Sequence, residues 1–107
     1  MPGNTRRNTR VQTGVPASLQ AAEGAIRGTL QNLSRGGMFF LSNRMLPVGQ
    51  AVQLQIELPG STPVQALGEV RYHHRNADGV GMGIRFLRLD GPSISFISQF
   101  VDARIAA

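Results

Sequence analysis

The segment 51–58 alternates strictly between apolar and polar side chains from position 52 onward. The apolar side chains are Val52, Leu54, Ile56 and Leu58, and the polar ones are Gln53, Gln55 and Glu57. Successive side chains of a β-strand point to opposite faces, so this period of two predicts a strand with one buried and one exposed face. The chain is therefore expected to fold around a sheet that packs one face on a core.

Further segments of strand length lie between turn signals. We expect strands at Val11–Val15, Ala25–Ser34, Met38–Ser42, Val64–His73 and Val80–Leu89. Proline, glycine and asparagine predict turns at 47–50, 59–63 and 76–79. Pro16 is expected to confine the first strand to an edge or to end it. The Ala and Gln content of segment 17–24 suits a helical turn, whereas a barrel topology would favour a continued strand or a loop.

The last segment of the chain has the pattern of a helix. Asp90 or Ser93 can cap exposed backbone N–H groups, and Pro92 suits a first helical turn. Apolar side chains then recur at helical spacing, namely Ile94, Ile97, Val101 and Ile105, flanked by Phe96 and Phe100. About six short strands and one terminal helix predict a mainly β fold, a small six-stranded antiparallel β-barrel with a C-terminal α-helix. Closure would leave no exposed sheet edge.

Composition excludes several classes of protein. The 107 residues suffice for one domain, and the absence of cysteine excludes disulfides and thiolate chemistry. No apolar run is long enough for a membrane span and no signal peptide is evident, so we expect a cytoplasmic protein. His73 and His74 are adjacent and would point to opposite faces of a strand, which argues against a shared metal. The carboxylates are scattered, and nothing positive supports an enzyme.

The stretch 32–37, Asn-Leu-Ser-Arg-Gly-Gly, is a candidate ligand site. On an extended strand Asn32 and Ser34 would present an amide and a hydroxyl on the same face. Gly36 and Gly37 remove Cβ where the backbone bends or a ligand approaches closely. The same residue types are also standard in β-turns, and this stretch alone favours the turn.

A second candidate lies near the N-terminus, where Arg6, Arg7 and Arg10 occur without any acidic neighbour. Arginine presents a planar fork of donors that fits phosphate oxygens and the O6/N7 edge of guanine. The net charge of +5, carried entirely by arginine, favours an anionic partner. Residues 4–10 contain no apolar side chain that could anchor to a core, so we expect residues 1–10 to form a flexible arm.

The two clusters together, RxxxR at 6–10 and NxSxxG at 32–37, resemble the PilZ domain, a β-barrel receptor for cyclic di-GMP. They occur in the expected order with 21 residues between Arg10 and Asn32. Gly36–Phe40 and Gly83–Leu87 also look like strands of that family, so the resemblance covers nearly the whole chain and implies a PilZ-like barrel domain at 11–107.

The resemblance also implies a non-enzymatic function and its residues. The expected cyclic di-GMP contacts are Arg6, Arg7, Arg10, Asn32, Ser34 and Gly37, with Arg7 secondary. No cofactor or metal is expected. The ligand would order the arm on the barrel, and the ordered arm would signal to a downstream protein partner. The family's usual outputs are motility, adhesion and exopolysaccharide control.

Two other functions stay open at this point. A PilZ-like adaptor could bind another protein without nucleotide, although the complete motifs argue against this. A small barrel could also bind single-stranded nucleic acid. Such proteins need exposed aromatic platforms, whereas the five phenylalanines here lie in apolar runs. Homo-oligomerisation is left open.

Overall fold

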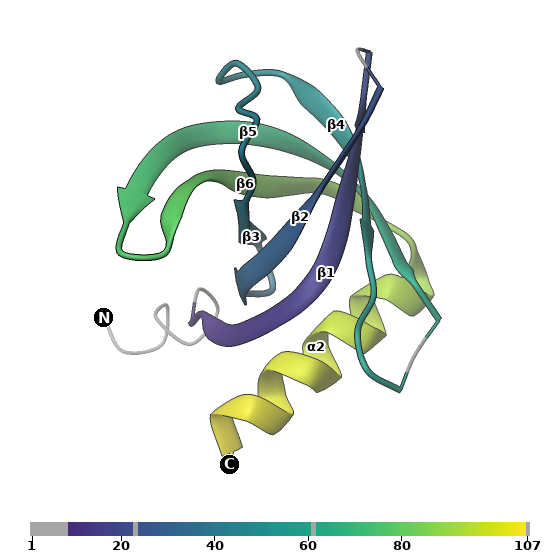
Figure 1. Cartoon of the computed structure of the whole chain (residues 1–107). Coiled ribbons are helices and arrows are strands. Elements are labelled where there is room, and N and C mark those ends of the chain that lie inside the picture. The colour runs from purple at the N-terminus through teal and green to yellow at the C-terminus, as the bar shows by residue number, and fades with distance from the viewer. Residues whose placement is uncertain (1–8, 23, 61, 107) are drawn as a thin grey trace, which may run out of the picture.

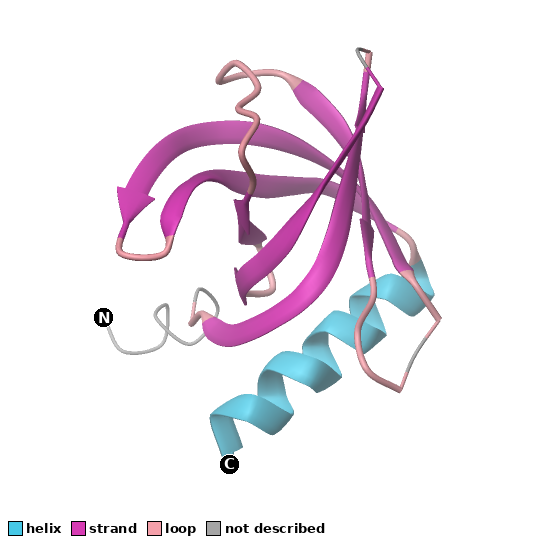
Figure 2. Cartoon of the chain, in the orientation of Figure 1, coloured by secondary structure: helices cyan, strands magenta, loops and turns pink. Residues whose placement is uncertain are grey.

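Six antiparallel strands close into a barrel and a helix follows them, in the computed structural model (Figure 1), which describes residues 9–22, 24–60 and 62–106. The strands are β1 (Val11–Ala21), β2 (Gly24–Leu33), β3 (Gly37–Leu41), β4 (Ala51–Ile56), β5 (Val64–Asn76) and β6 (Gly79–Leu89), and the helix is α2 (Gly91–Ala106). Around the barrel the order is β1-β2-β3-β6-β5-β4. The predicted fold class is confirmed, as Figure 2 makes plain.

The alternation at 51–58 places its apolar side chains in the core. Along β4 exposed and buried residues alternate, and Val52, Leu54 and Ile56 are buried. They join a single cluster with buried residues of every other strand and of the helix. Because β4 pairs with β1 on one side and β5 on the other, its inner face closes the barrel.

The first strand is longer than predicted, because it continues through Pro16 to Ala21. Pro16 lies opposite Thr29 of β2, and its carbonyl accepts a hydrogen bond from the Glu57 amide at 3.3 Å. The β1–β4 pairing begins only at Ala17, so the missing proline N–H falls just outside that ladder. The prediction that Pro16 could end the strand is therefore wrong, and 17–21 is strand rather than a helical turn.

The remaining predicted strands agree with the structure to within two residues, except that β5 runs three residues beyond His73 to Asn76. This extra length lets the β5–β6 hairpin curve until its tip lies on the side of the barrel where β1 begins (Figure 1). The tip is held there by the side chain of Gln31 in β2, which bonds both Asn76 and Asp78.

Helix α2 lies against β5 and β1, where it covers part of the barrel (Figure 1). Asp90 caps it: Oδ1 accepts a 2.7 Å hydrogen bond from the Ser93 amide. That backbone bond, and then the Ser93 hydroxyl, lower the pKa of Asp90, so the cap is complete at neutral pH and weakens as acid protonates the carboxylate. Ile97 and Val101 are buried, whereas Ile94 and Ile105 stay half exposed, so only the middle of the predicted stripe is core.

Candidate functional site

One row of residues crosses five strands on the outer face of the barrel. Gln12 of β1 lies opposite Asn32 of β2, which lies opposite Phe39 of β3; Phe39 lies opposite Gly83 of β6, and Gly83 opposite Tyr72 of β5. Residues paired in register point to the same face of a sheet. Phe39 belongs to this outer face, since it is buried but does not join the core cluster.

Arg10 spans this row from the start of β1. Its Nη1 donates to Oδ1 of Asn32 at 2.8 Å, and its Nη2 donates to the hydroxyl of Tyr72 at 3.3 Å. The second arginine of the RxxxR cluster and the first residue of the NxSxxG stretch are therefore in contact, although 21 residues separate them in sequence. Within the described part of the chain this is the one hydrogen bond of the Asn32 side chain, so one lone pair of its oxygen and both amide donors can face a ligand.

Tyr72 is the residue of this site that sequence reasoning missed. A Cβ built on Gly83 would lie 2.1–2.2 Å from three atoms of the Tyr72 ring, so the ring lies on the glycine backbone. Phe39 packs in the same way on Gly81, and the two rings stack with centroids 6.2 Å apart and an interplanar angle of 24°. At both positions the absence of a Cβ lets an aromatic ring pack directly on the β6 backbone.

Ser34 does not lie beside Asn32 on an extended strand, and that expectation is wrong. Strand β2 ends at Leu33, and Ser34 is buried in the turn that leads to β3. Its hydroxyl donates to the Gly37 carbonyl and accepts from the Gly36 amide, each at 3.3 Å. Asn32, by contrast, is partly exposed. The stretch is thus both a ligand candidate, at Asn32, and a turn, at 34–37.

Gly37 is required by the barrel itself. A Cβ on Gly37 would lie 2.3 Å from the Ile84 carbonyl oxygen, so only glycine lets β3 approach β6 this closely. Its expected role toward a ligand stays a prediction.

Replacing Gly37 with alanine should therefore lower the free energy of unfolding by about 1–3 kcal/mol, because one of the two strands must move. Gly91→Ala is the matched control, since nothing lies within 4 Å of that Cβ position. Urea unfolding measures both variants. A Gly37→Ala protein as stable as the wild type would show that β3 and β6 can separate without loss.

Arg6 and Arg7 lie outside the described residues, so the expected flexible arm is represented only by Thr9 and Arg10.

The site is also connected to helix α2 by side-chain contacts. Arg35, within the NxSxxG stretch, forms an ion pair with Asp102, and Nη1 of Arg104 donates to the Gln12 carbonyl at 3.0 Å.

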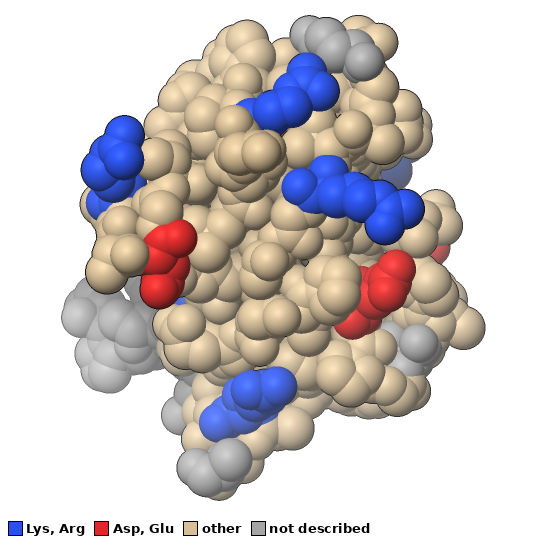
Figure 3. Space-filling model, in the orientation of Figure 1, with Lys and Arg blue, Asp and Glu red and all other residues tan. Residues whose placement is uncertain are grey.

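The described part of the chain holds no group of three or more metal-ligating side chains. Nε2 of His73 lies 2.7 Å from the Leu46 carbonyl, and His74 meets the Phe39 ring edge-on. None of the described helical residues forms a span long and apolar enough to cross a membrane. On the face shown in Figure 3, arginines and carboxylates are scattered over neutral surface, without the basic stripe typical of nucleic-acid binders.

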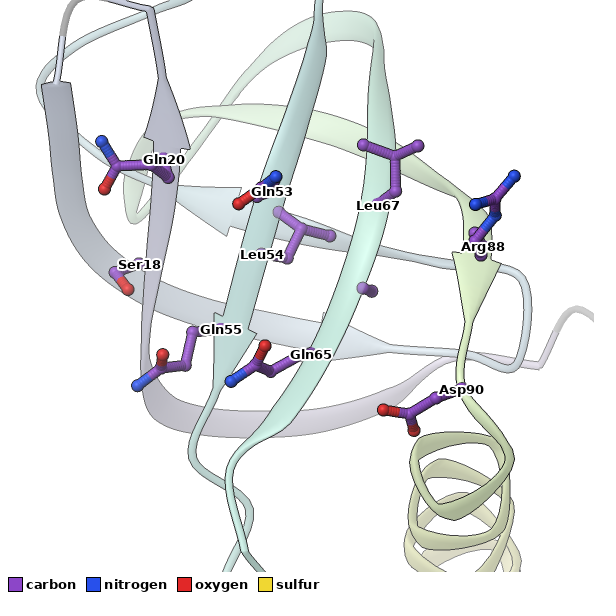
Figure 4. Close-up of a pocket in the computed structure, with 10 residues that line it drawn as sticks. Ser18, Gln20, Gln53, Leu54, Gln55, Gln65, Leu67, Arg88 and Asp90 are labelled. Carbon is purple, nitrogen blue, oxygen red and sulfur yellow. The ribbon is translucent and has the colours of Figure 1, made fainter.

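A depression of about 520 Å³ lies elsewhere, on the outer face of β1, β4 and β5. Figure 4 shows its polar lining, which includes Gln20, Gln53, Gln55 and Gln65, with Arg88 and Asp90 to one side. Gln20 is eight residues along β1 from Gln12, roughly 25 Å at strand spacing. Among the described residues that line the depression none is aromatic and one is an arginine. This lining is a poor match to the expected ligand, cyclic di-GMP, which carries two bases and two phosphates.

The family model described as PilZ domain matches residues 4–103 of this chain. The match includes both the RxxxR cluster at 6–10 and the NxSxxG stretch at 32–37, and it extends into α2. A comparison with curated proteins finds no match.

Solved structures share the fold. The Bacillus subtilis inhibitor of motility (MotI/DgrA) matches with a TM-score of 0.81 at 19% identity, over 91% of this chain and 49% of that one, so the chain spans about half of that relative. The PilZ domain of YcgR from Escherichia coli with c-di-GMP matches with a TM-score of 0.71 at 14% identity, over 92% and 89%. The PilZ domain of CeSA from a cellulose-synthesizing bacterium gives 0.63 at 17%, over 89% and 96%.

Proposed function

Since the chain belongs to the PilZ domain family, we propose that it is a receptor for cyclic di-GMP that acts by binding and not by catalysis. The observation that carries the proposal is the contact of Arg10 with Asn32, which joins the two clusters on one outer surface. A structural relative, the PilZ domain of YcgR, was solved with this ligand.

In this proposal Arg6 and Arg10 donate to the O6/N7 edges of the guanines and to the phosphates, and Arg7 assists. Arg10 uses two of its donor nitrogens on Asn32 and Tyr72 in the structure, and the rest of its five N–H groups can turn to a ligand. Asn32 accepts from guanine N1–H. Ser34 supports Asn32 by fixing the turn that follows β2. Gly37 has no Cβ and therefore lets the ligand lie close to the backbone.

The same site supplies a switch. Ordering an arm residue costs about 1–2 kcal/mol of backbone entropy, which charge-assisted bonds to the ligand must offset. Arg10 is already held on the barrel, so this cost falls on the residues that precede it. The ordered arm then offers a surface to a downstream protein in the cytoplasm. One structural relative is named an inhibitor of motility, and we place the output of this chain in motility, adhesion or exopolysaccharide control.

The decisive experiment compares two cyclic dinucleotides that carry the same phosphates. Adenine has an amino donor in place of O6, so it offers an arginine fork one acceptor, N7, instead of two, and it lacks the N1–H from which Asn32 would accept. Each bidentate contact contributes about 1–3 kcal/mol of discrimination. Cyclic di-GMP should therefore bind at least ~10-fold more tightly than cyclic di-AMP.

Calorimetric titration at two salt concentrations measures this preference, with a single-stranded oligonucleotide as a third ligand. Equal affinities for the two dinucleotides, together with a steep loss in salt, would reduce the site to a general anion patch. Tight binding of the oligonucleotide alone would favour a nucleic-acid function. If none of the three ligands binds, the chain would be a PilZ-like adaptor that binds another protein.

A further inference from the structure

Tyr72 is fixed in place but only partly covered. Its ring lies on the backbone of β6 at Gly83, where any Cβ would displace it, and yet 37% of the residue remains exposed. Phe39, the neighbouring ring on the same face, is 4% exposed and already fills the space over Gly81. Packing alone accounts for Phe39. It does not account for an open aromatic surface beside it.

The polar end of Tyr72 is directed at the two clusters. The ring atoms over Gly83 are Cε1, Cζ and Cε2, the end that carries the hydroxyl. The side chain therefore crosses β6 from β5 toward β3 and β2, and its hydroxyl accepts from Nη2 of Arg10. Tyr72 and Asn32 thus hold one guanidinium from two sides, which fixes where Arg10 can meet a ligand.

An exposed ring beside a positioned arginine is the arrangement that binds a flat base. Stacking of a base on an aromatic side chain contributes about 1–3 kcal/mol, and every base has a face to stack. The edge of a base stacked on Tyr72 would point along the row toward Arg10 and Asn32, whose donors and acceptor suit guanine.

We propose that Tyr72 is a further ligand-contacting residue of this site: one guanine stacks on its exposed face, while its hydroxyl positions Arg10. The proposal rests on the proposed function and adds a residue outside both sequence clusters. It also assigns Gly83 a role, since the absence of a Cβ at this position lets the Tyr72 ring lie directly on the β6 backbone, where a base can stack on it.

The chain offers a direct readout, because Tyr72 is its one tyrosine and there is no tryptophan. Intrinsic tyrosine emission therefore reports this ring alone. Titration of the full chain with cyclic di-GMP should quench that emission in parallel with the calorimetric binding curve. Free tyrosine in the same buffer, titrated identically, corrects for light absorbed by guanine.

Two substitutions separate the ring from the hydroxyl. Tyr72→Leu should weaken cyclic di-GMP binding ~10-fold through loss of stacking, and Tyr72→Phe should weaken it only ~3-fold, because the ring remains. Gly83→Ala should weaken binding at least as much as Tyr72→Phe, since the new Cβ displaces the ring. Gly91→Ala, with open space at its Cβ, should bind as the wild type does.

The outcomes are distinct from those of the proposed function. If the wild type binds cyclic di-GMP by calorimetry while its tyrosine emission stays constant and Tyr72→Leu binds normally, the role of Tyr72 is refuted and the receptor function stands. If the wild type does not bind, both proposals fall. Thermal unfolding of each variant shows whether any lost affinity reflects a damaged fold.

Discussion

Arg10→Ala should weaken cyclic di-GMP binding by about 100-fold and leave the fold intact. Hydrogen bonds to a charged group contribute about 1.5–3 kcal/mol each, and the proposed role gives Arg10 both a guanine edge and a phosphate. A loss of about 2.8 kcal/mol corresponds to a factor of 100. The bonds that Arg10 makes to Asn32 and Tyr72 without ligand are exposed, so the free energy of unfolding should change by less than about 0.5 kcal/mol.

The matched control is Arg88→Ala, which removes the same charge beside the glutamine-lined depression. Calorimetry should find its affinity within about twofold of the wild type if binding depends on position and not on net charge. Arg6→Ala tests the arm, because a weakening comparable to that of Arg10→Ala requires residues before Thr9 to reach the ligand. Normal binding by Arg6→Ala and Arg10→Ala together would show that the site is elsewhere.

The sequence predicted those parts of the fold that depend on local patterns. Alternation at β4 depends only on neighbours in the chain, and the glycine, proline and asparagine turns are local too. The prediction that Pro16 could end the first strand failed because the effect of a proline depends on which partner strand lies beside it. The β1–β4 ladder starts one residue later, at Ala17. Ser34 misled for a related reason, since the strand that should have presented it ends at Leu33.

Tyr72 shows most clearly why part of the site could not be predicted. Uninterrupted alternation along β5 would put Tyr72 on the inner face with Gly68 and Val70, which are buried. The pairing of β5 with β6 instead shifts between Val70 and Tyr72, so that Tyr72 falls opposite Gly83 on the outer face. A bulge of this kind arises from pairing between strands, and the order of residues within β5 does not reveal it.

Ile56→Ala should have the opposite effect to Arg10→Ala, a large loss of stability with the site preserved. Ile56 is fully buried on β4, between Ala17 of β1 and Val64 of β5. Truncating a buried isoleucine removes its transfer free energy and leaves a cavity, which together cost about 2–5 kcal/mol. For a domain stabilised by about 5–15 kcal/mol this is a large fraction.

Urea unfolding measures this loss as a lower midpoint at unchanged slope. Gln55→Ala is the control, because Gln55 neighbours Ile56 on the exposed face and should change the free energy of unfolding by less than about 0.5 kcal/mol. At low temperature, where Ile56→Ala stays mostly folded, its affinity for cyclic di-GMP should remain within about twofold of the wild type, since the residue lies inside the barrel and the site outside. A loss below about 1 kcal/mol would mean that the barrel repacks around the cavity. A stable variant that no longer binds would mean that the core of β4 and the outer row are coupled. That result would contradict the expectation that Ile56 contributes to stability alone and Arg10 to ligand binding alone.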